Sequence, residues 1–158
     1  MTLLEACEWL KATRLSVFIR ESKWGFALVE MVHLLALAAL GGAVLILGLR
    51  IFGLILKGQP LEATMRDLSR IILVSLLTLL VSGFLLFADG PLRYYGNTAF
   101  RVKLLLIIAA TVTTVAVHHF AQLRMARGIA PKRLKIATAL SLTLWLGAAV
   151  AGRVIGVL

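Results

Sequence analysis

Residues 24–56 read WGFALVEMVHLLALAALGGAVLILGLRIFGLIL, an apolar run whose strongly polar side chains are Glu30, His33 and Arg50. About twenty apolar residues in a helix are enough to cross the roughly 30 Å hydrocarbon layer of a bilayer. The run therefore predicts a transmembrane helix. Because it is longer than a perpendicular span, we expect the helix to tilt or to extend beyond the headgroups, with Arg50 near one interface.

Three further apolar runs of similar length follow, at residues 71–88, 104–123 and 136–158. Short segments that carry Gly and Pro separate the runs, and such segments are typical of turns. Short loops make successive spans antiparallel, so we expect an all-α membrane protein with an up-and-down four-transmembrane-helix bundle over residues 23–158.

The composition of the 158-residue chain agrees with a membrane protein, since 61% of the residues are hydrophobic and only 15% are charged. A soluble domain is nearer half apolar and a quarter charged. The chain has 17 Lys and Arg against 7 Asp and Glu, a net charge of +10. Most of these cations flank apolar runs, where they suit anionic headgroups, so the lipid bilayer is the expected partner and nucleic acid is not.

The membrane orientation follows from the distribution of these cations. Nine Lys and Arg lie on the side of the first and third loops, against eight on the other side, and residues 124–135 hold a compact cluster. The positive-inside rule then places this loop side in the cytoplasm. We expect a multi-pass protein of the bacterial inner membrane with periplasmic termini.

Residues 1–22 form a separate amphipathic segment. Apolar side chains alternate there with Glu, Lys and Arg at helical spacing, which predicts a helix lying on the membrane surface. Acidic residues stand where a signal peptide would carry its basic region, and no apolar region follows, so we expect the segment to be retained.

Few residue types are available for metal or covalent chemistry. Cys7 is the single cysteine, and the sequence has no CxxC or CxxCH motif, so a metal would be held by His, Lys, Met or carboxylate. The chain also lacks a phosphate-binding loop, a nucleophile elbow and an HExxH motif. Ordinary hydrolase chemistry is therefore unsupported.

Polar side chains at membrane depth are costly and mark candidate sites. Glu30 and His33 share one face of the first span, which continues through Gly41 and Gly48 and so predicts close approach of a helix or a flat ligand. Lys103 begins a polar stripe of the third span at a similar depth. We expect these side chains to gather in the outer half of the bundle, with Arg153 of the fourth span neutralising Glu30.

His118 continues the same stripe, which also includes Thr111 and Thr114. It lies fifteen residues beyond Lys103, about 22 Å along the helix. Two axial ligands of one haem need similar depth, so His33 pairs better with Lys103 than with His118. A lysine ligates iron only in its neutral form, and His33 alone would hold a five-coordinate haem.

Each of these side chains also has a purely structural interpretation. His33 would then be an interhelical hydrogen-bond donor, Lys103 an interfacial cation, and His118 with His119 an interfacial pair. The glycines would serve helix packing alone.

The sequence resembles a bacterial family of four-helix membrane proteins of unknown function, the domain of unknown function 6644. The resemblance is carried by residues 30–42, 49–53, 82–88 and 95–104 and ends around His118. Family members commonly carry an acidic residue before the Leu-Arg of the first span, where this chain has Gly48.

More distantly, the order of these motifs is similar to HemJ-type protoporphyrinogen oxidases and CopD-type copper-resistance membrane proteins. The motifs are a His in the first span, Leu-Arg at its end, a Gly in the second span, aromatic-x-x-Lys opening the third and a late His. The first resemblance implies b-type haem, with His33 and Lys103 at the positions of the functional His and Lys. The second implies copper.

These observations predict a small haem b protein that transfers electrons or oxidises a membrane-accessible substrate. His33 would be the axial ligand, and Lys103 would be a second ligand or a partner of a haem propionate. Glu30 would orient the site or balance its charge, and Arg153 would pair with a propionate or with Glu30.

One alternative is a non-enzymatic accessory subunit or a copper-handling protein, although the scattered methionines form no copper array. A weaker one is a proton or small-solute conduit along Lys103 to His118. A redox partner, a larger membrane complex or a homo-oligomer is compatible with each.

Overall fold

The computed structural model describes the backbone of residues 2–124 and 132–155, and the side chains of 2–121 and 132–155. The third predicted connection and part of the basic cluster between 124 and 135 lie outside these residues. Seven helices are described: α1 (Leu3–Ala12), α2 (Arg14–Glu21), α3 (Gly25–Phe52), α4 (Leu61–Asp89), α5 (Pro91–Tyr95), α6 (Thr98–Arg124) and α7 (Lys132–Ile155).

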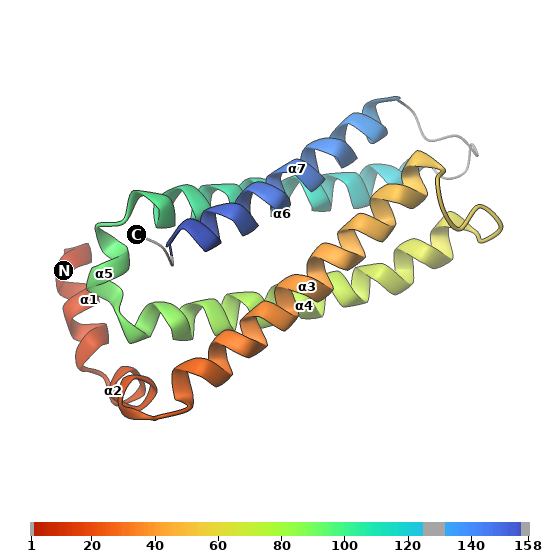
Figure 1. Cartoon of the computed structure of the whole chain (residues 1–158). Coiled ribbons are helices and arrows are strands. Elements are labelled where there is room, and N and C mark those ends of the chain that lie inside the picture. Colours follow the sequence, from red (N-terminus) through yellow and green to blue (C-terminus); the bar gives the residue numbers. More distant parts are fainter. Residues whose placement is uncertain (1, 125–131, 156–158) are drawn as a thin grey trace.

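Four of these helices, α3, α4, α6 and α7, are long and apolar enough to cross a membrane. This confirms the predicted multi-pass, all-α architecture. Successive long helices run antiparallel, and α1, α2 and α5 lie together at one end (Figure 1). We call this the α5 end, and the opposite end, where the α3–α4 connection lies, the loop end.

The helix boundaries differ from the ends of the apolar runs, for local reasons. The helix α3 ends at Phe52 because Gly53 adopts a left-handed conformation (φ 77°), and its N–H bonds back to the Arg50 carbonyl, 3.0 Å away. The helix α4 begins at Leu61, ten residues before the apolar run, because its first turns carry charged residues that extend beyond the span. Arg50 donates to the Gln59 carbonyl at 2.6 Å, which anchors the connection.

The four spans form two hairpins, α3 with α4 and α6 with α7. The hairpins meet mainly through α3 and α7, whereas α4 and α6 barely approach each other in the described part of the chain (Figure 1). The bundle is therefore two packed pairs joined along one seam.

Close packing concentrates in the middle of the bundle and toward the loop end. One buried cluster joins Leu40 and Val44 of α3 to Ala110 of α6 and Trp145 of α7. A second, larger cluster lies toward the loop end and joins all four spans: Ala43, Leu47, Ile51, Met65, Leu68, Val117, Ala121 and Leu134. No buried cluster of this kind occurs nearer the α5 end among the described residues.

Two features hold the middle of the bundle together. A Cβ atom added to Gly48 would lie 2.9 Å from Cδ1 of Leu142, so the glycine permits the close approach of α3 and α7. Between α6 and α7, the Thr114 hydroxyl lies 2.8 Å from the Ser141 hydroxyl and accepts a 3.0 Å hydrogen bond from the Trp145 indole. These contacts fix the depth at which the helices cross.

The N-terminal segment forms two helices rather than the single predicted one. Thr13 separates them, since its hydroxyl accepts a hydrogen bond from the Ser16 N–H and caps α2. The helix α1 packs against α5, and α2 packs against α3 and α4. Ser16 is fully buried and donates to the Ala88 carbonyl, which attaches α2 to the end of α4.

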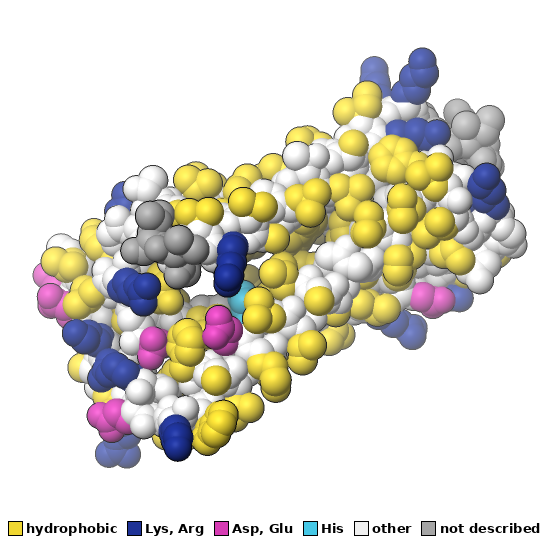
Figure 2. Space-filling model, in the orientation of Figure 1, with side chains coloured by type: hydrophobic (Ala, Val, Ile, Leu, Met, Phe, Trp, Pro, Cys, Tyr) yellow, Lys and Arg dark blue, Asp and Glu magenta, His cyan; other side chains and the backbone are white. Residues whose placement is uncertain are grey.

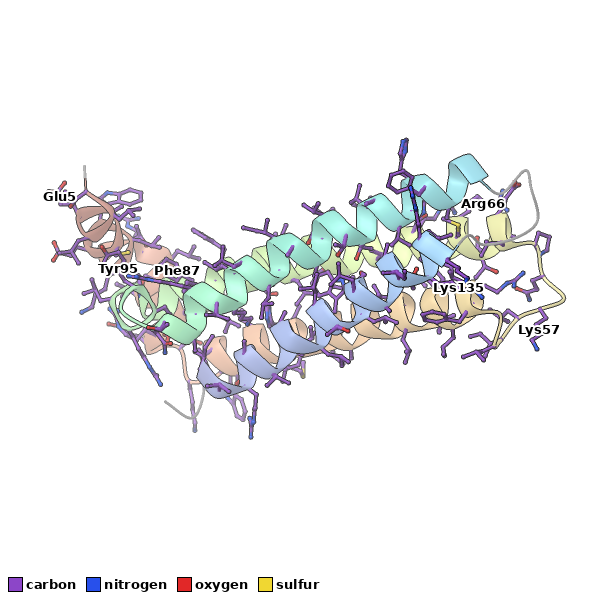
Figure 3. All side chains as sticks on the ribbon, turned by 90° about the horizontal axis from the view of Figure 1, so that it is seen from above. Glu5, Lys57, Arg66, Phe87, Tyr95 and Lys135 are labelled. Carbon is purple, nitrogen blue, oxygen red and sulfur yellow. The ribbon has the colours of Figure 1, made fainter. Side chains whose placement is uncertain are left out.

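Charged and polar side chains mark both ends of the bundle. Glu5 and Tyr95 lie at the α5 end, and Lys57, Arg66 and Lys135 lie at the loop end (Figure 3). The site described below lies near the α5 end.

Candidate functional site

His33 is a half-buried side chain of α3 that faces α4. Its Nδ1 atom lies 2.9 Å from Oγ of Ser82. Ser82 donates its own hydroxyl proton to the Thr78 carbonyl, 2.6 Å away, so it accepts the hydrogen bond from His33. The Nδ1 atom of His33 therefore carries the proton, and Nε2 keeps a free lone pair.

Gly83 provides the surface against which the imidazole ring lies. A Cβ atom at Gly83 would be 3.4 Å from Cε1 of His33, in van der Waals contact with the ring. Together, Ser82 and Gly83 fix both the tautomer and the position of the ring.

Lys103 of α6 approaches His33 from the second hairpin. It is half-buried and close enough to His33 for an electrostatic interaction between them. A Cβ atom at Gly152 of α7 would lie 3.1 Å from Nζ of Lys103, so this glycine leaves room for the amine. Within the described ranges, Lys103 forms no salt bridge with a carboxylate.

The two hairpins leave a hollow at this level. Figure 2 shows the side of the bundle hollowed between them near the α5 end, with a histidine at the bottom and basic and acidic side chains at the rim. The hollow arises because the buried clusters hold the hairpins together in the middle of the bundle and toward the loop end, but not near the α5 end. The structure thus brings His33 and Lys103 together, as their depth predicted.

Glu30 and Arg153 are both exposed. Glu30 interacts electrostatically with the Tyr94 phenol. No hydrogen bond or salt bridge joins Glu30 to Arg153 or to His33 in the described residues, so the expected neutralisation of Glu30 by Arg153 is not found there. Ser82, rather than Glu30, orients the imidazole.

Three aromatic rings pack where α4, α5 and α6 meet. The centroids of Phe87, Tyr94 and Phe100 lie 5.4 to 6.1 Å apart. Burial raises the pKa of the Tyr94 phenol; Arg93 opposes this shift, and Asp89 and Glu30 add to it. The aromatic cluster joins α4, α5 and α6 at the α5 end of the bundle.

His118 lies far from this site, beside the buried residues Val117 and Ala121. Its Nε2 atom is buried and has no hydrogen-bond partner among the described residues. Between Lys103 and His118, Ala110 is fully buried and Thr114 bonds to α7. Helix packing therefore interrupts the predicted polar stripe.

The described residues contain no group of three or more His, Cys, Asp or Glu side chains able to hold a metal ion. A copper or zinc ion bound by protein alone usually needs three or four such ligands. Haem iron takes four ligands from the porphyrin and one or two from the protein. His33 and Lys103 offer two candidate ligands, which is fewer than a metal ion bound by protein alone usually needs.

Three small residues at this site, Ser82, Gly83 and Gly152, were not among the predicted site residues. Ser82 and Gly83 are the polar and small positions of an apolar stretch of α4. Their spacing gave no sign that they face His33, because the contact joins two helices.

Comparison with known proteins gives one match. A family model described as a family of unknown function, DUF6644, matches residues 7–158. No curated protein and no solved structure matches the chain significantly.

Proposed function

The chain belongs to the family of unknown function DUF6644, and from the geometry of its site we propose that it is a b-type haem protein of the bacterial inner membrane. In this proposal it transfers electrons or oxidises a membrane-accessible substrate. The bound haem would supply one-electron redox chemistry.

The observation that carries this proposal is the hydrogen bond between His33 and Ser82. A histidine that ligates iron through Nε2 commonly donates its Nδ1–H to a fixed acceptor, which sets the tautomer and the ring orientation. Ser82 supplies that acceptor at 2.9 Å. The free Nε2 lone pair of His33 is then available to an iron ion.

The surroundings of His33 fit a haem in three respects. The hairpins leave a hollow between them, as Figure 2 shows. Lys103 reaches the same level from α6, where it would serve as a second axial ligand or bind a haem propionate. The exposed guanidinium of Arg153 on α7 suits a propionate at the rim, and Glu30 balances the added charge.

A non-enzymatic accessory subunit is the second candidate. The observation in its favour is that the bond between His33 and Ser82 also joins α3 to α4, which is a packing role. Copper handling has less support, because no group of three or more candidate ligands occurs in the described part of the chain. The conduit has less support too, since the Thr114 hydroxyl is engaged by Ser141 and Trp145.

The orientation proposed for the protein follows from charge. Lys57, Arg66 and Lys135 gather at the loop end (Figure 3), and cytoplasmic loops are rich in such residues. The loop end would then face the cytoplasm, and the site would lie in the periplasmic half of the membrane.

An absorption spectrum of the purified protein tests the proposal. We expect a b-type spectrum in the oxidised and dithionite-reduced forms, with one haem per chain by the pyridine haemochromogen assay. His33→Ala should remove the Soret band, whereas His119→Ala, at an exposed position far along α6, should keep it. Absence of haem after expression with an adequate supply, or a His33→Ala protein with an unchanged spectrum, would contradict the proposal.

A further inference from the structure

The hollow between the two hairpins opens on the side of the bundle rather than at its end (Figure 2). The long helices run across the view of Figures 1 and 2, so the hollowed face in Figure 2 is a flank of the membrane-crossing bundle. Its position follows from the packing: α3 and α7 meet at Gly48 and Leu142 and diverge toward the α5 end. In a membrane, this opening faces lipid.

Access from water at the nearer end is restricted. The helices α1, α2 and α5 lie across the α5 end in Figure 1, and Phe87, Tyr94 and Phe100 pack against one another there. A reactant of this site would therefore reach it more readily from the bilayer, which selects molecules that dissolve in lipid.

The charged residues around the opening add a chemical requirement. Glu30 is an exposed carboxylate one helical turn from His33, and its charge reaches the Tyr94 phenol. Arg153 is exposed on the last turn of α7. The carboxylate can accept a proton, and the guanidinium can donate a hydrogen bond to an oxygen atom. A lipid-soluble reductant that releases protons together with electrons matches these groups.

We propose that the reductant of this site is a membrane-dissolved hydroquinone, which enters between α3 and α7 and gives a proton to Glu30. Its oxidation to the quinone breaks two O–H bonds and releases two protons and two electrons. One hydroquinone would serve two protein molecules in turn, each of which takes one proton at its Glu30 and one electron at the haem that it would hold. The proposal rests on the haem-binding function above for its electron acceptor.

Photolabelling tests the binding step independently of haem. The full chain in lipid nanodiscs, with and without haem, is irradiated with an azido-quinone, and the labelled peptides are identified by mass spectrometry. We expect label near Glu30 and Arg153 that excess decylubiquinone prevents. An azido fatty acid serves as the control for general lipid contact. The same pattern with the fatty acid, or competed label confined to other segments, would overturn the inference.

Reduction kinetics test the role of Glu30. Under anaerobic conditions, decylubiquinol should reduce the ferric protein about a hundredfold more slowly in Glu30→Gln, because the proton acceptor is lost. Glu30→Asp should recover part of the rate, and Glu62→Gln, at an exposed position of α4 near the loop end, should leave it unchanged. Dithionite, which needs no proton acceptor, should reduce all four proteins equally.

The two proposals fail in different ways. Equal decylubiquinol rates in the original protein and in Glu30→Gln would overturn the hydroquinone inference while haem binding stands. A protein that takes up no haem despite an adequate supply, yet shows competed quinone label at the opening, would support the binding site and contradict the haem proposal.

Discussion

His33 donates a hydrogen bond from its Nδ1–H across the α3–α4 interface to Ser82, whose own hydroxyl donates one to the carbonyl of Thr78. The chain of two hydrogen bonds, 2.9 and 2.6 Å long, ends on the backbone of α4. The ring of His33 is thus oriented by a rigid element of the fold, and each of its neighbours can be tested separately.

Ser82→Ala should weaken haem binding about 10- to 100-fold while His33 remains present, because the ligand loses the acceptor that sets its tautomer. Haem titration followed by absorption spectroscopy measures this change. Ser69→Ala is the matched control on the same helix, since the Ser69 hydroxyl bonds only to the Arg66 carbonyl. Equal affinities for the two variants would contradict a positioning role for Ser82.

Gly152→Val should reproduce the spectrum of Lys103→Met. A Cβ atom added at Gly152 would lie 3.1 Å from Nζ of Lys103, so the larger side chain displaces the amine. If Lys103 is the sixth ligand of iron, both variants should shift the ferric protein toward the five-coordinate, high-spin spectrum. Gly41→Val is the control, because an added Cβ there meets no atom within 4 Å.

Gly48→Val should lower the free energy of unfolding by about 1–3 kcal/mol, because the new side chain overpacks the contact with Leu142 and Thr138. Unfolding in mixed micelles, followed by near-ultraviolet circular dichroism, measures the loss. Gly41→Val, on the same helix in open space, should change stability much less. If the two variants were equally stable, the α3–α7 seam would not depend on Gly48.

Thr114→Val should destabilise the α6–α7 hairpin by about 1 kcal/mol, because it leaves the Trp145 indole N–H without its acceptor. The emission spectrum of Trp145, in a background without Trp9 and Trp24, should shift as its environment changes. Thr143→Val is the control, since that exposed hydroxyl bonds only to the Ala139 carbonyl of its own helix.

Tyr94 can be titrated alone, since the chain contains only two tyrosines and Tyr95→Phe removes the other. Absorbance at alkaline pH should show a pKa above the ordinary value for tyrosine, because burial disfavours the phenolate. Adding Glu30→Gln should lower this pKa, since one of the charges that raise it is removed. An unchanged titration would mean that Glu30 does not face Tyr94 in solution.

The spans themselves could be predicted from the sequence because crossing a bilayer requires about twenty apolar residues whatever the neighbours. The depth of a residue in the membrane depends only on its position within its own span. His33 and Lys103 were therefore expected at one level. The ends of the helices were predicted less accurately. The first apolar run continues to Leu56, whereas α3 ends at Phe52, before Gly53. The helix α4 begins at Leu61, because its first turns contain charged residues that precede the apolar run.

Contacts between helices could not be predicted in the same way. Up-and-down connectivity permits both a closed bundle and two hairpins that meet along one seam. Gly41 and Gly48 were expected to serve one close approach, yet only Gly48 contacts another helix, and Gly41 faces open space. Ser82 was not recognised as the partner of His33, because their pairing depends on how α3 is rotated against α4.

The division into hairpins has a consequence for biosynthesis. During translation, α3 and α4 emerge first and can pair in the membrane before α6 and α7 exist. His33 is then already oriented by Ser82, while Lys103 and Gly152 have still to arrive. The complete pocket forms only when the last helix has inserted, so a cofactor that needs both hairpins is acquired at the end of assembly rather than as a nucleus for it.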